Sequence, residues 1–242
     1  QTYPRLVDAQ IVNALAVAAA AAHKCATDIR LLSNRKEIEE PFGKHQVGSS
    51  AMAYKRNPMR CERICGMARF VMSLAQNPLN TAALQWFERT LDDSSNRRLV
   101  LPEAFLALDG VLEIMHNVAR GLVVYEKTIR ANLMAELPFM ATENILMAAV
   151  QQGADRQEAH ELIRRHSQAA AHAVKAEGKA NDLLERLRGE AMFAEIDLDA
   201  VLNPMAYVGR APEQVDRFLA DIVDPIRRDY ADALGEAAEL SV

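Results

Sequence analysis

Residues 48–59 read Gly48-Ser49-Ser50-Ala51-Met52-Ala53-Tyr54-Lys55-Arg56-Asn57-Pro58-Met59. The glycine and the two serines favour a loop, whereas Asn57 and Pro58 favour a helix start, as N-cap and first helical residue. Apolar residues then recur with helical spacing to Leu74, so we predict a helix from Pro58 to about Ala75. The stretch thus places reactive and basic side chains beside a helix N-terminus, where free N–H groups favour an anion.

The residues around this helix start also have a purely structural interpretation, in which Asn57 caps a solvated surface loop. Arg56, Arg60 and Arg63 crowd the same helix end, where the helix dipole is unfavourable for cations. Either an anionic ligand compensates their charge, or they form a solvated face that pairs with Glu62. The pattern alone leaves both explanations open.

The composition is that of a globular protein with a real core. The chain has 242 residues, of which 50% are hydrophobic and 25% charged, with only 10 Gly and 9 Pro. This length allows one or two domains. A formal net charge of -5 gives no indication of a nucleic-acid-binding or membrane-binding surface, so we expect neither as a partner.

The three cysteines, Cys25, Cys61 and Cys65, predict reduced thiols in a cytoplasmic protein, because no extracellular disulfide framework accompanies them. Cys61 and Cys65 lie on one helix face without a nearby His or Cys to complete a metal site, so we expect both in the core. Residues 160–161 (His-Glu) begin like a zinc-protease motif, but the next histidine lies off the required helix face. We expect no metal and no cofactor.

Helical periodicity dominates the chain, and no alternating pattern predicts a strand. We predict a first long helix over residues 5–33. Its apolar run at residues 11–22 is too short to span a bilayer. Few large polar side chains interrupt this helix, so we expect most of its circumference to be buried in a bundle.

A second long helix should follow a break at residues 76–79. Asp92, Asp93 and Ser94 are its candidate N-caps. It should run to about Arg120, with a kink or an interruption at Pro102.

Shorter helices follow, the last over residues 211–234, with Asp155 as a candidate N-cap and Gly178 as a candidate helix stop. We therefore predict an all-α fold. A long-helix bundle should cover residues 1–124 and a smaller helical domain residues 125–242.

Arg89, Ser94 and Arg98 surround the predicted start of the second long helix. Two guanidinium groups and a hydroxyl form a candidate phosphate clamp. In the alternative interpretation, Asp92 and Asp93 simply pair with these arginines. The pattern alone does not decide between the two.

The stretch at residues 48–59 resembles the signature of the fumarase/aspartase superfamily, of the form GSSxMxxKxNP, and its continuation through Arg63 is similar to the adenylosuccinate lyase family. Ala53 departs from the family pattern, which usually has proline there; the change loosens the backbone but removes no reacting group. The resemblance covers about the second half of such a lyase. It implies the superfamily's central helical bundle followed by a helical C-terminal domain. Since the chain opens on Gln1 without a methionine, we expect it to be cut from a longer protein.

The resemblance implies a lyase of purine nucleotide biosynthesis. Such an enzyme eliminates fumarate from adenylosuccinate, giving AMP, and from the succinylated aminoimidazole carboxamide ribotide (SAICAR), giving AICAR. By resemblance Ser49 is the proton-abstracting base, with Ser50 as runner-up, and Lys55 and Asn57 stabilise the developing negative charge. Serine is a poor base at its ordinary pKa, so its alkoxide would need a nearby cation and a site closed to water.

Further residues match substrate-binding positions of the family, with the last three at the nucleotide phosphate: Gln1, Met52, Arg63, Arg89, Ser94 and Arg98. The family's general-acid histidine lies in a half that this sequence does not contain, so we expect the chain to be inactive by itself. The resemblance also implies a homotetramer whose active sites are shared between subunits.

Two alternatives stay open. The chain could belong to another lyase of the superfamily, such as an argininosuccinate lyase. Only a phosphate-bearing substrate needs the cluster of Arg89, Ser94 and Arg98, so this cluster discriminates between them. The chain could also be a non-catalytic helical assembly fragment, which would explain its Ala- and Leu-rich helices without any chemistry.

Overall fold

The computed structural model describes residues 3–43, 52, 54–87 and 89–233. Apart from two strands of two residues each, its regular elements are helical, which confirms the predicted all-α class. These residues divide into two compact units, the first of which ends at Glu126 and the second of which starts at Lys127.

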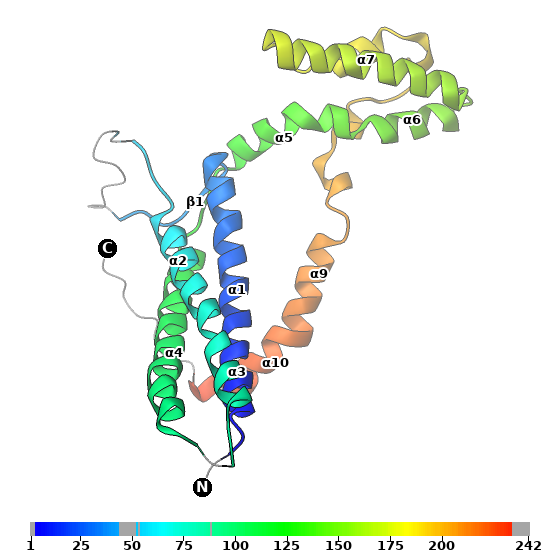
Figure 1. The fold of residues 1–242 in the computed structure, drawn as a ribbon. Coiled ribbons are helices and arrows are strands. Elements are labelled where there is room, and N and C mark those ends of the chain that lie inside the picture. The colour runs from blue at the N-terminus through cyan, green and yellow to red at the C-terminus, as the bar shows by residue number, and fades with distance from the viewer. Residues whose placement is uncertain (1–2, 44–51, 53, 88, 234–242) are drawn as a thin grey trace. The chain divides into compact units, whose positions relative to one another are not determined.

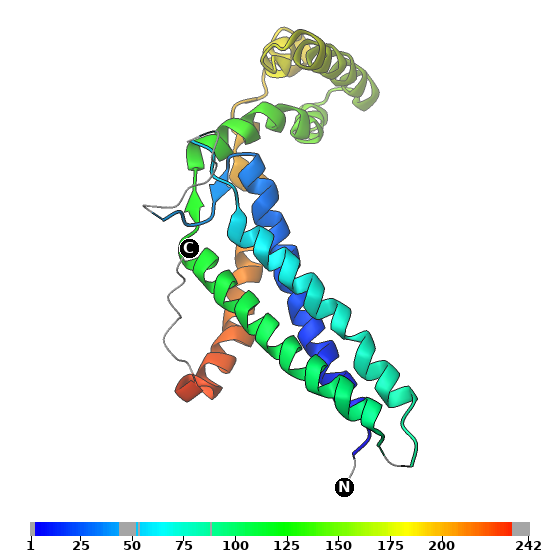
Figure 2. The same cartoon turned by 60° about the vertical axis from the view of Figure 1, so that its left-hand side comes forward.

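The first unit is a bundle of long helices. In it, α1 (Leu6–Asn34), α2 (Met59–Leu74) and α4 (Leu91–Arg120) run side by side, and the short α3 (Gln76–Ala83) continues from α2 (Figures 1 and 2). Buried Ala, Val, Ile and Cys side chains from α1, α2 and α4 fill the space between these helices. The core thus depends on small and branched residues that let the helix axes approach closely.

The helices α1 and α4 start at one end of this bundle, and α2 starts at the other end (Figure 1). At the first end, the Arg5 backbone N–H donates to Gln85, which precedes α4. At the second end, β1 (Ile38–Glu39), which follows α1, pairs antiparallel with β2 (Val123–Val124), which follows α4. Since α4 has 30 residues, the two ends are about 40 Å apart at a rise of 1.5 Å per residue.

A buried network of ion pairs joins the starts of α1 and α4. The Arg5 Nε donates to Asp93 Oδ2 at 2.8 Å, and the two side chains are only 5% and 7% exposed. The Arg97 guanidinium binds Asp8 and also donates to the Tyr3 hydroxyl. Burial by itself would raise the pKa of Asp8, but hydrogen bonds from Arg97 and Tyr3 lower it below the ordinary value. The Asp8–Arg97 pair is therefore ionic at neutral pH.

The prediction of Asp92, Asp93 or Ser94 as the N-cap of α4 is wrong. Thr90 occupies the N-cap position, and all three residues lie inside the first turn. Asp93 instead directs its carboxylate at Arg5. A long-range ion pair thus replaces the local cap that the sequence pattern favours.

The predicted break at residues 76–79 is also wrong. The helices α2 and α3 are separated only at Ala75, because Pro78 lies in the first turn of α3, where its missing N–H costs no helical hydrogen bond. Pro102 does not interrupt α4, which runs continuously past it to Arg120.

The second unit contains α5 (Glu126–Met140), α6 (Thr142–Gln151), α7 (Arg156–Glu177) and α8 (Leu183–Arg188). Asp155 caps α7 as predicted, because its carboxylate accepts the N–H groups of Gln157 and Glu158 at 2.9 and 3.0 Å. Gly178 ends the helix with a left-handed φ of +66°, also as predicted. The core of this unit includes Leu137, Ile145, Leu183, Leu187 and Phe193.

The end of the second unit is more broken than predicted. Short 3-10 turns follow α8, at Ala191–Phe193, Ala200–Leu202 and Pro204–Tyr207. In place of one helix over residues 211–234, the chain forms α9 (Ala211–Phe218), a π-helical turn (Leu219–Val223), α10 (Asp224–Asp229) and a last 3-10 turn (Ala231–Ala233).

The helix α1 is less enclosed than its composition predicts. Its buried residues lie along one stripe, while Val17 is 72% exposed and Leu31 is 62% exposed. The apolar run at residues 11–22 is part of this longer helix, so its shortness does not argue against a membrane span. By length and composition α1 meets the requirements for one, as do α5 and α6 as a bent pair. Core helices of soluble proteins meet them too, and α1 packs against α2 and α4.

We expect Asp93→Ala to destabilise the first unit, because it leaves the Arg5 guanidinium buried without its carboxylate. Removing one partner of a buried ion pair typically costs about 3–5 kcal/mol. Urea denaturation of the intact protein, followed by circular dichroism, should show a loss of this size. The control Asp92→Ala removes an exposed carboxylate one residue away and should cost about 1 kcal/mol or less. Equal losses in the two variants would contradict the role of the pair.

Candidate functional site

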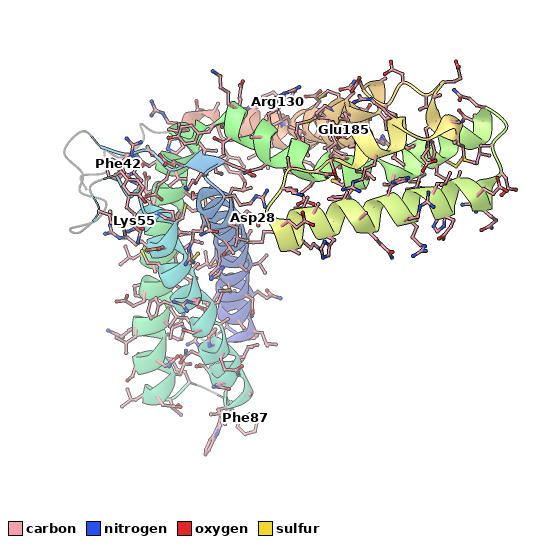
Figure 3. All side chains as sticks on the ribbon, turned by 90° about the horizontal axis from the view of Figure 1, so that it is seen from above. Asp28, Phe42, Lys55, Phe87, Arg130 and Glu185 are labelled. Carbon is pink, nitrogen blue, oxygen red and sulfur yellow. The ribbon has the colours of Figure 1, made fainter. Side chains whose placement is uncertain are left out.

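The described part of the signature loop lies at the end of the bundle where α2 starts. A turn bond from the Lys55 N–H to the Met52 carbonyl, at 3.0 Å, shapes this part, and both side chains are exposed. Figure 3 shows Lys55 at the same end as Phe42. The predicted base Ser49, its neighbour Ser50 and the predicted substrate contact Gln1 lie outside the described residues.

The start of α2 differs from the prediction. Pro58, not Asn57, is the N-cap residue, and α2 begins at Met59 without a side-chain bond from its own N-cap. Proline has no side-chain acceptor, so the first N–H groups need another partner. Glu40 is this partner: its Oε1 accepts from the Arg60 N–H and its Oε2 from the Cys61 N–H, each at 3.0 Å.

The anion at the α2 start is therefore a side chain of the same chain. Glu40 is only 4% exposed, so its charge meets the positive end of the helix dipole at short range. Two of the free N–H groups at this helix end are therefore bound within the chain, whereas Ser49 and its predicted role lie outside the described residues. Sequence analysis missed Glu40, and the one signal for it was a helix start rich in arginine without an acidic cap of its own.

The arginines near the α2 start have different surroundings. Arg56 pairs with Glu39 at 3.1 Å, and the Arg60 guanidinium donates to the Pro41 carbonyl. Arg63 is exposed on the first turns of α2 and has no carboxylate partner within the described ranges. Of these arginines, Arg63 remains the candidate substrate ligand.

Cys61 and Cys65 are buried in the bundle core, which confirms the structural role predicted for them. Burial and, after it, the nearby Glu40 carboxylate raise the pKa of Cys61 to about 12. Cys61 is thus a neutral thiol near pH 7. Across the part of the chain that the structure describes, no group of three or more His, Cys, Asp or Glu side chains could hold a metal ion.

A pocket of about 410 Å³ lies at the other end of the bundle, beside the start of α4. The predicted phosphate residues gather in its wall, and the Arg98 Nε donates to Ser94 Oγ at 3.3 Å. The full lining is Arg5, Arg89, Ser94, Arg97, Arg98, Leu101 and Pro102.

Arginines dominate this pocket, but two of them have internal partners. Arg5 pairs with the buried Asp93, and Arg97 pairs with the buried Asp8. Their positive charge is therefore largely compensated within the protein.

The other two pocket arginines, Arg89 and Arg98, are exposed and pair with no carboxylate among the described residues. The alternative in which Asp92 and Asp93 neutralise them is therefore not what the structure shows. Two guanidinium groups and the Ser94 hydroxyl remain for a ligand, and this set suits a phosphate group.

The two groups of predicted site residues lie far apart within the chain. Ser94 is in the first turn of α4, and Gly121 follows its last turn. Gly121 packs so closely on Pro41 that a Cβ there would come within 2.6 Å of the proline Cβ, and Pro41 is next to Glu40 at the α2 start. The helix in between rises about 40 Å.

Figure 3 shows the same separation, with Lys55 and Phe87 at opposite ends of the bundle. One chain therefore cannot bring Lys55 and Asn57 to the same small molecule as Arg89 and Arg98.

Family comparisons agree with both units. The family model described as "Adenylosuccinate lyase C-terminus" matches residues 138–218, and the model described as "Lyase" matches residues 5–73. The chain is 59% identical over 221 residues to the adenylosuccinate lyase of Schizosaccharomyces pombe. The matched region covers 90% of this chain and 46% of the relative. It is 49% identical over 245 residues to that of Schistosoma mansoni, which covers 100% of this chain and 51% of the relative.

Solved structures show the same fold. A fumarate lyase from Mesorhizobium sp. BNC1 matches with a TM-score of 0.71 and 27% identity, over 90% of this chain and 47% of that chain. A 3-carboxy-cis,cis-muconate lactonizing enzyme from Pseudomonas putida matches with a TM-score of 0.73 and 26% identity, over 88% of this chain and 46% of that chain.

The chain spans about half the length of the curated relatives it matches. Its signature stretch, its helical bundle, its basic pocket and both family models point to one group of lyases. The chain therefore belongs to the adenylosuccinate lyase family.

Proposed function

We propose that the intact protein containing this chain eliminates fumarate from adenylosuccinate, giving AMP, and from SAICAR, giving AICAR. The observation that carries this proposal is the pocket in which Arg89, Ser94 and Arg98 converge, with no carboxylate among the described residues paired to either arginine. A lyase of the same superfamily that acts on a substrate without phosphate, such as an argininosuccinate lyase, would have no use for such a pocket.

In the proposed reaction the Ser49 alkoxide removes a proton from the carbon next to a carboxylate of the succinyl group. The electron pair left on that carbon is delocalised into the carboxylate, where Lys55 and Asn57 supply a cation and a hydrogen-bond donor. The carbon–nitrogen bond then breaks, its electrons go to the leaving nitrogen, and fumarate gains the double bond. The leaving nitrogen takes its proton from a general acid, which the family resemblance assigns to a histidine outside this chain.

We also propose a homotetramer whose active sites combine residues of different subunits. The separation of about 40 Å between Lys55 and the phosphate pocket supports this arrangement, because one chain cannot contribute both to one substrate. The exposed apolar face of α1, with Val17 and Leu31, supports it as well, since helices of neighbouring subunits would cover it.

The remaining assignments follow the same proposal. Met52 and Arg63 lie exposed at the signature-loop end, where they would contact the succinyl part of the substrate. Reduced cysteines favour a cytoplasmic location. The 242-residue chain by itself should not turn over, because no residue in it matches the family's general acid.

We expect Arg98→Ala in the intact protein to weaken AMP binding by about tenfold or more, because a charge-assisted hydrogen bond contributes roughly 1.5–3 kcal/mol. Isothermal titration calorimetry with AMP measures the change. The control Arg120→Ala removes an exposed arginine at the far end of α4 and should leave the affinity unchanged. Unchanged AMP affinity in Arg98→Ala would contradict the phosphate assignment.

We expect Ser49→Ala to abolish most fumarate release while leaving substrate binding largely intact, because the hydroxyl acts mainly in the transition state. Stopped assays at saturating adenylosuccinate, with Ser50→Ala as the matched control, distinguish the two serines. A slow Ser50→Ala variant beside a fully active Ser49→Ala variant would move the base to Ser50. Fumarate release by the purified 242-residue chain would mean that one of its own histidines is the general acid.

Shared sites also predict complementation between two impaired variants. When Ser49→Ala and Arg98→Ala proteins are mixed under conditions that exchange subunits, some sites receive an intact Ser49 and an intact Arg98 from different chains. Random assembly should restore up to about a quarter of wild-type activity at substrate concentrations below KM. As a control, mixing Ser49→Ala with the double variant Ser49→Ala/Arg98→Ala should restore none. No recovery in the first mixture, despite verified exchange, would contradict shared sites.

A further inference from the structure

We propose that Glu40, assisted by Glu39, is a positioning residue for catalysis: it fixes the start of α2 and thereby the places of Lys55 and Asn57. This inference rests on the proposed function, because those places matter for turnover only if Lys55 and Asn57 act on the substrate. Neither glutamate needs to touch the substrate for this role. The segment that carries them, residues 36–42, is called the strap below.

The strap is held firmly by contacts with α1, with β2 and with the end of α4. Lys36 has a left-handed φ of +61°, a backbone conformation that is unfavourable for a residue with a Cβ and that turns the chain out of α1. The following residues pair with β2, where Ile38 lies opposite Val124. Gly121 packs directly on Pro41, in a space that no Cβ could share. The strap is therefore anchored to both α1 and α4.

From this anchored position Glu40 reaches the first turn of α2. Both carboxylate oxygens are used, one by the Arg60 N–H and the other by the Cys61 N–H. Since Pro58 offers no side-chain acceptor, Glu40 fulfils the capping function that a local Ser, Asp or Asn usually has. The buried Glu40 carboxylate, with its two hydrogen bonds, restricts the orientation of the helix start more than solvent molecules would.

Glu39 holds the loop just before this helix start. Its Oε2 accepts hydrogen bonds from Arg56 at 3.1 Å and from the Tyr125 hydroxyl at 2.8 Å. The Arg56 guanidinium also lies over the Phe42 ring, 4.9 Å from its centroid. Because Arg56 stands between Lys55 and Asn57 in the sequence, this contact fixes the backbone from which both candidate catalytic side chains extend.

The two glutamates therefore hold successive points of one short segment. Glu39 holds residue 56, and Glu40 holds residues 60 and 61, so the chain between them has little freedom to shift. Glu39, Glu40, Phe42, Arg56 and Asn57 also line one small cavity of about 10 Å³, which leaves almost no empty space at this junction. A misplacement of about 1 Å at a reacting group can cost a hundredfold in rate.

The test is Glu40→Gln in the intact protein. The amide keeps the size of the side chain but retains one acceptor oxygen, so its NH₂ group faces one of the two backbone N–H groups. We expect kcat for fumarate release to fall about tenfold to a hundredfold. We expect the AMP dissociation constant to stay within about twofold, because Lys55 and Asn57 act on the succinyl part of the substrate, which AMP lacks, and Glu40 does not line the phosphate pocket.

Hydrogen exchange measured by mass spectrometry supplies a readout that does not depend on turnover. In Glu40→Gln, amides of residues 55–61 should exchange faster, whereas those around residues 91–98 should not change. The matched control Glu37→Gln makes the same chemical change on the strap, where the carboxylate pairs with Arg35 instead of α2. It should leave kcat and exchange at residues 55–61 at wild-type values.

Glu39→Gln serves as a second variant, since its side chain is 25% exposed and tolerates the change more easily than the buried Glu40. It should lower kcat with AMP affinity retained. Wild-type kcat or unchanged exchange at residues 55–61 in Glu40→Gln would overturn the positioning role, as would a parallel loss of AMP binding and helicity. If the wild-type protein releases no fumarate, the proposed function is refuted. The exchange result then still tests whether Glu40 caps α2.

Discussion

The rise of α4, at 1.5 Å per residue, sets the distance between the two chemically important ends of the bundle. Leu91 begins this helix beside the basic pocket, and Arg120 ends it beside the strap and the signature loop. Buried residues along α4 pack against α1 and α2, so α4 stays extended between the two ends of the bundle. The proposed function requires one substrate to meet groups that lie about 40 Å apart within a chain. The proposed assembly of several chains would meet this requirement, and the exposed apolar face of α1 offers a surface for it.

Internal carboxylates decide which arginines are available to a ligand. At the α4 start, Asp8 and Asp93 neutralise Arg97 and Arg5, so that the exposed Arg89 and Arg98 remain. At the α2 start, the carboxylates of the strap perform the same function for the helix end and for Arg56. A buried ion pair adds little to stability compared with apolar packing, although losing one partner is costly. We infer that these pairs mainly determine which arginines remain available to a ligand.

Much of the fold could be predicted from local patterns. The helical periodicity, the Asp155 cap, the Gly178 stop and the buried pair Cys61 and Cys65 follow from neighbouring residues alone, and the structure confirms them. The grouping of Arg89, Ser94 and Arg98 in one pocket could be predicted too, because they lie within one or two turns of a single helix start; their role at a phosphate stays a prediction. Local rules failed where a distant residue competed with them: Asp93 pairs with Arg5 instead of capping α4, and Glu40 caps α2 in place of Asn57.

A structure of the intact protein with bound AMP tests the central claim most directly. Our account predicts that the phosphate lies between Arg89 and Arg98 of one subunit, while the nearest Lys55 and Asn57 belong to a different subunit. A phosphate bound away from Arg89 and Arg98, or an AMP molecule whose nearest Lys55 and Arg98 come from the same chain, would contradict it.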